Sequence, residues 1–77
     1  MVSRSDRFTA AISKVGDARS EIEDLRDELQ SWLDNMPENL QDGEKAGQLQ
    51  EAIDALETVI SSLEEAEGET VDFPGMM

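Results

Sequence analysis

Apolar and small residues recur along the first half of the chain at alternating intervals of three and four positions. This spacing keeps them on one side of an α-helix and is the heptad pattern of a coiled coil. The series comprises Phe8, Ala11, Val15, Ala18, Ile22, Leu25, Leu29, Trp32 and Met36. Ser5 or Asp6 can cap the start of this helix, and Pro37 disfavours helical geometry in the residue before it. We therefore expect a first helix over about residues 6–35.

A second series with the same alternation lies nearer the C-terminus and comprises Ala46, Leu49, Ile53, Leu56, Ile60 and Leu63. Asp42 can cap this helix, and Gly68 is a typical residue just after a helix end. We expect a second helix over about residues 44–67, followed by a C-terminal tail over residues 68–77. The bend over residues 36–43 is rich in turn-forming residues, which favours a reversal of the chain there.

Folding the two series against each other gives an all-α structure, an antiparallel αα-hairpin resembling a coiled coil, as a single domain over residues 1–77. This arrangement places Leu25 and Trp32 inside, against the second helix. Because the first helix is the longer one, apolar residues near its start, such as Phe8, have no partner on the second helix. The tail segment 71–77 carries apolar groups that can cover them.

Two helices cannot enclose a core, and a chain of 77 residues buries only a limited fraction of its surface. Further apolar residues broaden each stripe beyond a two-stranded seam. We expect these residues to meet another copy, so that hairpins assemble into a homo-oligomeric helical bundle, with a dimeric four-helix bundle as the simplest form. The residues predicted at this oligomer interface are Phe8, Ile12, Leu33 and Val59.

The net charge limits the classes of partner that the protein can bind. Nineteen acids against six bases give a net charge of -13, which opposes direct binding to nucleic acid or to an anionic membrane and suits a basic protein partner. No stretch approaches the roughly 20 apolar residues that span a bilayer. We therefore expect a soluble, cytoplasmic protein that binds neither nucleic acid nor membrane.

Candidate chemistry is sparse. Histidine, cysteine and tyrosine, which often act as catalytic bases or nucleophiles, are absent, and the serines have no base beside them. The same absences leave no zinc ligand set of the usual kind. The bend is rich in side-chain oxygens, but a calcium loop begun at Asp34 fails at its third position, which is Met36. We predict no enzymatic activity, no metal and no cofactor.

The acids form rows along the predicted helices. Residues three or four positions apart on a helix lie about 5–6 Å from each other, close enough to the spacing of nucleic-acid phosphates to permit mimicry. Any acidic amphipathic helix also produces such rows to keep itself solvated. The residues predicted to form a partner-binding acidic face are Asp17, Glu21, Asp24, Glu28, Glu51 and Asp54.

The N-terminal end is basic, because the first twenty residues hold four of the six bases and only two of the nineteen acids. In an oligomer, symmetry can gather Arg7, Lys14 and Arg19 from several copies around a small anionic ligand. The alternative is internal pairing with the acids of residues 64–69, which an antiparallel fold brings to the same end.

The bend sequence LQSWLDNMPENLQ at residues 29–41 and the ending VDFPGM at residues 71–76 resemble small acidic helical proteins encoded by bacteriophages, a group without a characterised function. The likeness covers the bend and the tail. It implies a viral context and transfers no site residues. Short phage proteins of this kind are often inhibitors of host enzymes or defence systems.

These observations predict a non-enzymatic, homo-oligomeric protein that binds and inhibits a basic host or defence component through its acidic helix faces. One alternative is an oligomeric sponge that sequesters a nucleotide-type signalling ligand at a basic subunit interface. Another is a structural or assembly role in the virion.

Overall fold

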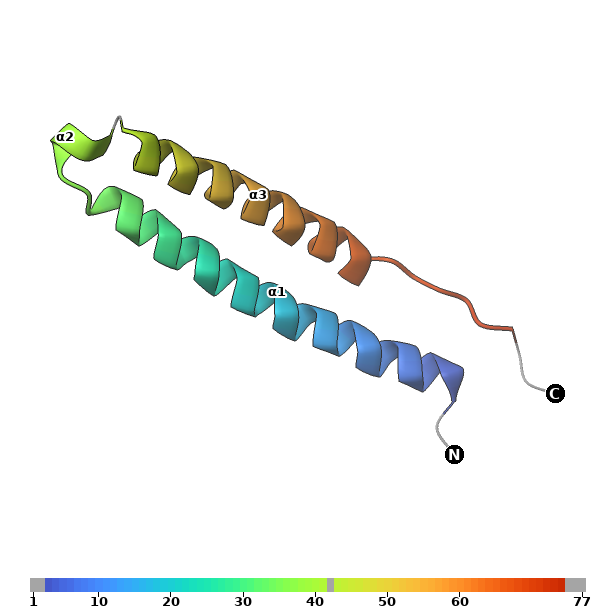
Figure 1. Ribbon diagram of the computed structural model, residues 1–77. Helices are drawn as coiled ribbons and strands as arrows, with labels where there is room; N and C mark the ends of the chain where they lie inside the picture. Colours follow the sequence, from blue (N-terminus) through green and yellow to red (C-terminus); the bar gives the residue numbers. More distant parts are fainter. Residues whose placement is uncertain (1–2, 42, 75–77) are drawn as a thin grey trace.

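The computed structural model describes residues 3–41 and 43–74, and the predicted all-helical class is confirmed within them. Helix α1 spans Arg4–Asp34, the short helix α2 spans Glu38–Gln41, and α3 spans Glu44–Glu67. The two long helices lie side by side and give an elongated molecule of 67 × 16 × 13 Å (Figure 1). Within the described residues, no helix is long and apolar enough to cross a membrane.

Helix α1 begins earlier than the sequence pattern indicates, because its cap is Ser3 rather than Ser5 or Asp6. The Ser3 hydroxyl oxygen accepts a hydrogen bond from the backbone N–H of Asp6 at 3.0 Å, and the Ser3 carbonyl accepts one from the N–H of Arg7. A serine in this position satisfies an amide that the first turn leaves without an intrahelical partner. The extra residues lengthen α1 to 31 residues.

The bend contains a helical turn that the sequence pattern does not predict. After Asn35 ends α1, Pro37 precedes α2, and its carbonyl accepts a hydrogen bond from the N–H of Leu40 at 2.9 Å. The N–H of Gly43 donates to the Leu40 carbonyl at 3.0 Å. Gly43 then caps α3 without a side-chain hydrogen bond, and the cap predicted at Asp42 lies outside the described residues.

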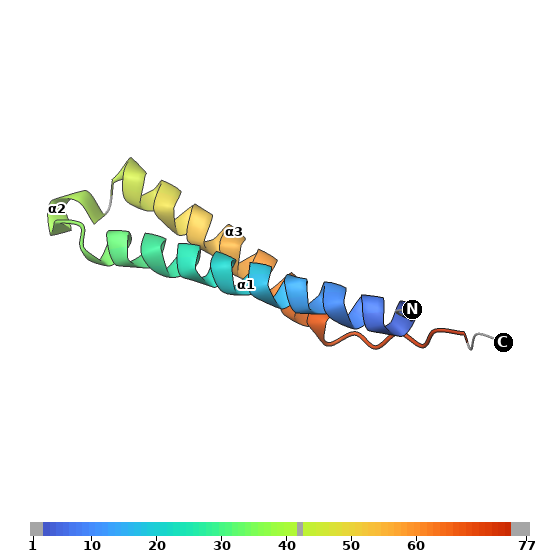
Figure 2. The same ribbon diagram turned by 90° about the horizontal axis from the view of Figure 1, so that it is seen from below.

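Helix α3 covers the same residues, 44–67, that its heptad pattern indicates. Gly68 caps its end by donating its N–H to the carbonyls of Glu64 and Glu65. The tail then continues beside the part of α1 that extends beyond α3 (Figure 2). The rings of Phe73 and Phe8 lie 5.8 Å apart between centroids and are tilted by 60°, so the tail covers Phe8 as expected. The tail residues 75–77 lie outside the described part of the chain.

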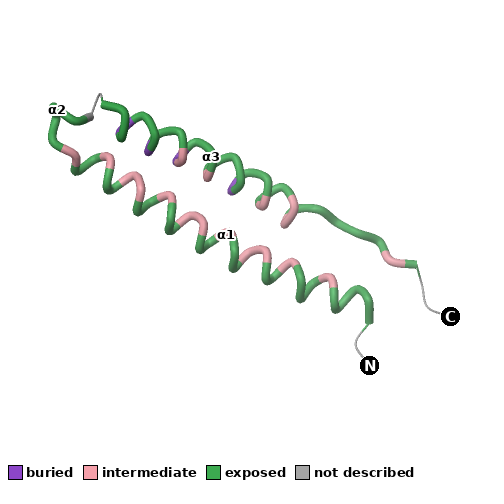
Figure 3. The backbone as a smooth tube through the Cα atoms, in the orientation of Figure 1, coloured by how far each residue is buried: buried purple, intermediate pink, exposed green. Residues whose placement is uncertain are grey.

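The buried residues of the described chain all lie on α3. They are Ala46, Leu49, Ile53 and Ile60. The residues of α1 that face α3 are half-buried at most (Figure 3). A pair of helices covers each helix from one direction only, which leaves the flanks of the seam in contact with solvent.

The seam on α1 differs from the predicted one at alternate positions. Leu25 is 51% exposed and Trp32 is 50% exposed, and Ala11 and Ala18 are also exposed, so the expected interior placement of Leu25 and Trp32 is wrong. The residue directly after each of these four is half-buried instead. The half-buried seam of α1 comprises Phe8, Ile12, Val15, Arg19, Ile22, Arg26, Leu29 and Leu33, and Met36 just beyond the helix is also half-buried.

This seam admits two arginines because their aliphatic stems can cover apolar neighbours while their charged ends reach outward. One of them, Arg19, also meets an acid of α3 at the end of the seam. Leu25 and Trp32 therefore lie on a flank of the helix pair, where they are half exposed.

Candidate functional site: acidic helix faces and an internal ion-pair cluster

The acidic residues predicted to bind a partner are all exposed. On α1 they are Asp17, Glu21, Asp24 and Glu28, and on α3 they are Glu51 and Asp54. None of the six forms an ion pair within residues 3–41 and 43–74. Asp54 has a local partner, since the side-chain amide of Gln50 donates to its carboxylate at 3.0 Å.

The structure does not combine these six acids into one face. On each helix the acids follow the side opposite to the half-buried or buried seam, as their positions relative to the heptad require. Because the two seams face each other, the α1 row points away from α3 and the α3 row points away from α1. The protein therefore presents two separate acidic rows. The row of Asp17, Glu21, Asp24 and Glu28 on α1 is the longer one, and we call it the α1 acidic row.

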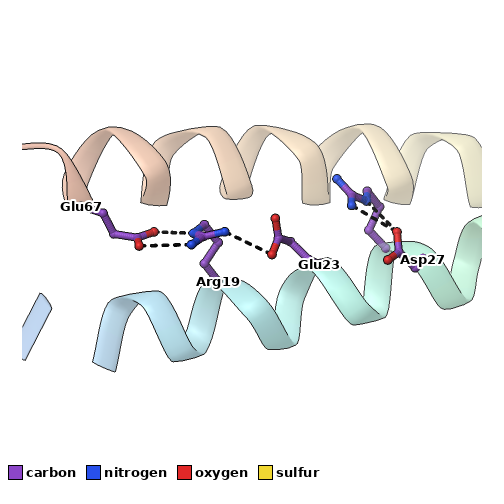
Figure 4. Close-up of polar contacts among 5 residues, drawn as sticks. Arg19, Glu23, Asp27 and Glu67 are labelled. Atoms are coloured by element: carbon purple, nitrogen blue, oxygen red, sulfur yellow. Dashed lines mark hydrogen bonds and ion pairs between the residues drawn. The ribbon is translucent and has the colours of Figure 1, made fainter. Parts of the chain in front are cut away.

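A cluster of charged side chains closes the seam where α3 ends (Figure 4). The guanidinium of Arg19 donates from Nε and Nη2 to the two carboxylate oxygens of Glu67, the second of these bonds being 3.3 Å long. Its Nη1 donates to the Glu23 carboxylate at 3.2 Å. The side chains of Arg19 and Glu67 are only 25% and 23% exposed. This fork geometry joins α1 to α3 and fixes their relative placement at this end.

The hydrogen bond that Arg19 donates to Glu67 is the main cause of a raised pKa of the Arg19 guanidinium. The nearby negative charges of Glu67, Glu23 and Glu64 also raise this pKa, whereas partial desolvation lowers it. A raised pKa means that folding favours the charged form. The stability that the charged form of Arg19 contributes is then present below the ordinary guanidinium pKa and is lost as pH rises through the raised value. Arg19 therefore stays charged over the pH range in which proteins normally function.

The three cations predicted to bind an anion are not gathered in one place. Arg19 faces α3 and is engaged by two carboxylates, whereas Arg7 and Lys14 are exposed and form no ion pair within the described residues. Of the two uses left open for these bases, internal pairing is therefore confirmed for Arg19. The sponge alternative would require a ligand phosphate to displace Glu67 from Arg19, or to bind through Arg7 and Lys14 without it.

The residues predicted at an oligomer interface divide into two groups. Phe8, Ile12 and Leu33 are half-buried on the side of α1 that faces α3, whereas Val59 is 42% exposed on α3. Sequence reasoning missed the exposed apolar pair of Leu25 and Trp32. The signal that could have found them is the adjacency of two possible seams, since each of these residues directly precedes another seam candidate.

Trp32 also contacts a cation of the other helix. The Nζ atom of Lys45 lies 5.6 Å from the centre of the Trp32 ring, within the range of a cation–π interaction. This contact crosses the flank of the seam near the bend. It establishes which positions of α1 and α3 share one side of the helix pair.

No group of acids in the described residues has the arrangement of a metal site. The fold and these surfaces define a small, acidic protein built on two long helices. Comparison with protein families, with curated proteins and with solved structures finds no match for this chain. Its function is therefore inferred from geometry and charge.

Proposed function

We propose that the chain is a non-enzymatic interaction protein whose helical hairpins assemble into a homo-oligomer and bind a basic protein partner through the α1 acidic row. The observation that carries this proposal is that the four carboxylates of the row are exposed and have no ion-pair partner in the described chain. With six bases against nineteen acids, the chain cannot neutralise them internally.

The row has the dimensions of a binding surface for a basic segment. Asp17 and Glu28 lie eleven residues apart on one helix, which corresponds to about 16 Å at 1.5 Å per residue. An exposed ion pair contributes at most about 1 kcal/mol, so four such pairs give modest affinity. Their summed field accelerates association and favours basic partners over acidic ones.

Regular carboxylates on a straight helix also suit a partner surface that binds nucleic-acid phosphates. The likeness of the bend and tail to phage proteins points to a host enzyme or defence component in the host cytoplasm as the target. Inhibition follows if the acidic row occupies the basic surface that the partner uses for its own ligand.

The test measures binding of a fluorescently labelled, lysine- and arginine-rich peptide by anisotropy. In the test variant the row is neutralised by Glu21→Gln, Asp24→Asn and Glu28→Gln. The control variant loses the same number of charges at exposed acids of α3, by Glu57→Gln, Glu64→Gln and Glu65→Gln. Comparing the two separates the position of the charges from the net charge.

We expect the test variant to bind at least about tenfold more weakly than the control, which corresponds to about 1.4 kcal/mol. Added salt should weaken binding of the wild-type protein and bring the variants together. Equal loss in the two variants would show that only net charge matters, and unchanged binding in both would refute the proposal.

A further inference from the structure

The contact between Trp32 and Lys45 defines one side of the helix pair. Each of these residues directly precedes a residue of the seam, Leu33 on α1 and Ala46 on α3, and their side chains meet beside it. In an antiparallel pair, the residues one position before these seam residues lie on the same side of both helices. Steps of seven residues return to that side after two turns of a coiled-coil helix.

The residues at these seven-residue steps form an apolar strip that includes positions of both helices. On α1 it contains Ala11, Ala18, Leu25 and Trp32, and on α3 it contains Ala52, Val59 and Ala66, with Lys45 at the end near the bend. Leu25, Trp32 and Val59 are among the most exposed large apolar side chains of the described residues. From Ala11 to Trp32 the strip is about 32 Å long.

The opposite side of the pair has the reverse composition. The corresponding positions there hold polar or small residues, with three glutamates and two glutamines among them. They are Thr9, Gly16, Glu23, Gln30, Gln50, Glu57 and Glu64. A polar side is what a helix pair needs toward water, so the apolar composition of the strip requires a different explanation.

The strip is complementary to itself under a two-fold rotation. Its large side chains, Leu25 and Trp32, lie toward the bend, and α1 contributes only Ala11 and Ala18 toward the other end. A two-fold axis across α1 near Glu21 places Ala11 opposite Trp32 of a second copy, and Ala18 opposite its Leu25. Large residues then meet small ones, as close packing requires.

The charges along the rim of the strip favour the same arrangement. Lys14 lies one turn from Ala11 and Ala18, whereas Glu28 lies one turn from Leu25 and Trp32. The two-fold rotation brings Lys14 of one copy near Glu28 of the other. A two-fold axis parallel to the helices would instead gather both Glu28 side chains at one end, which like-charge repulsion disfavours.

We propose that a second copy of this chain docks on the apolar strip, with α1 crossing α1 in antiparallel orientation, to form a four-helix bundle. This inference rests on the homo-oligomer in the proposed function and names its interface. It replaces the half-buried Phe8, Ile12 and Leu33 by Leu25 and Trp32 as the apolar anchors and retains Val59.

The first test is sedimentation of wild-type protein and of Leu25→Glu, with Ser20→Glu as the matched control. Ser20 is exposed on the polar side of α1, so the control adds the same charge away from the strip. Leu25 is half exposed in the single chain, so its replacement should leave helicity unchanged, as circular dichroism can verify. We expect the wild-type protein and the control to form dimers. The dissociation constant of the dimer should be at least about a hundredfold higher for Leu25→Glu, because the interface would bury a carboxylate.

The second test uses the absence of cysteine from the chain. Single variants Ala18→Cys and Leu25→Cys are mixed, refolded together and oxidised gently. The antiparallel arrangement predicts a mixed disulfide between the two variants and little self-crosslinking of either one. Ser20→Cys mixed with Leu25→Cys is the control that should not crosslink.

A monomeric wild-type protein, a dimer insensitive to Leu25→Glu, or a dimer without the mixed disulfide would each overturn the inference. Each of these outcomes is measured without a peptide, so it is distinguishable from a failure of the peptide assay, although Glu28 belongs both to the acidic row and to the rim of the strip. Salt distinguishes the two further: it should strengthen a dimer of chains carrying -13 each, whereas it should weaken binding of a basic peptide.

Discussion

Replacing Ile53 by alanine tests whether the narrow core on α3 holds the helices together. Ile53 is 2% exposed, the lowest value among the buried residues of the described chain. The substitution removes three carbons, which at about 0.8 kcal/mol per buried methylene gives roughly 2.4 kcal/mol. A cavity usually adds to this loss, but the open flanks of a helix pair allow neighbours to close in. We therefore expect a loss of about 2–3 kcal/mol.

That loss is large for this chain. At about 0.05–0.15 kcal/mol per residue, a protein of 77 residues has a total stability of roughly 4–12 kcal/mol. Urea unfolding followed by circular dichroism measures the change, at one fixed protein concentration because association also stabilises the folded state. Leu40→Ala in α2 is the control, since Leu40 is 51% exposed and its truncation should cost less than about 1 kcal/mol. Equal effects of the two substitutions would refute the assignment of the core to α3.

Three further changes probe the ends of the helices. Glu67→Gln should weaken the bidentate hydrogen bonding by Arg19 and speed amide exchange in the last turn of α3. The control Glu65→Gln, at an exposed acid, should speed this exchange less, and high salt should remove the difference between the two variants. Phe73→Ala should release the tail from α1 and cost about 1 kcal/mol, because it removes an aromatic pair, with limited proteolysis of the tail as the measurement. Ser3→Ala should cost about 1 kcal/mol through loss of the cap, detected as a lower melting temperature; an unchanged value would contradict the capping role.

The heptad pattern suffices to predict the long helices because the spacing of apolar residues, a proline and a glycine act locally. Helix α3 therefore has the expected range, and Gly68 ends it as predicted. The start of α1 was misplaced because Ser3, Ser5 and Asp6 are all competent caps, and local sequence does not rank them. The turn α2 depends on hydrogen bonds to Pro37 and Gly43 that no periodicity reports.

The seam of α1 was misassigned for a physical reason. Two neighbouring series fit the same alternation, one through Leu25 and Trp32 and the other through Arg26 and Leu33. Apolar content favours the first series if α3 is the only neighbour. The structure selects the second for the α3-facing side, with Arg19 bound to Glu67 at its end. Leu25 and Trp32 are thus left half exposed on a flank that α3 does not cover.

The apolar strip and the α1 acidic row are neighbours on α1, so we expect the proposed assembly and the proposed partner binding to be coupled. In the proposed dimer the two-fold axis lies near Glu21, so the acidic rows of the two copies approach each other along one edge. Their repulsion opposes association, and a basic peptide lying along that edge neutralises both rows. A ligand that binds the dimer more tightly than the monomer must shift the equilibrium toward the dimer, and the coupling is reciprocal.

We therefore expect a lysine- and arginine-rich peptide to tighten the dimer, measured by sedimentation at low salt with and without the peptide. Leu25→Glu should in turn weaken peptide binding, although it removes no acid from the chain and adds one. That direction is opposite to a simple charge effect, because an added carboxylate would otherwise strengthen the attraction. Peptide binding that is equal or stronger in Leu25→Glu would show that the acidic row acts in each copy alone.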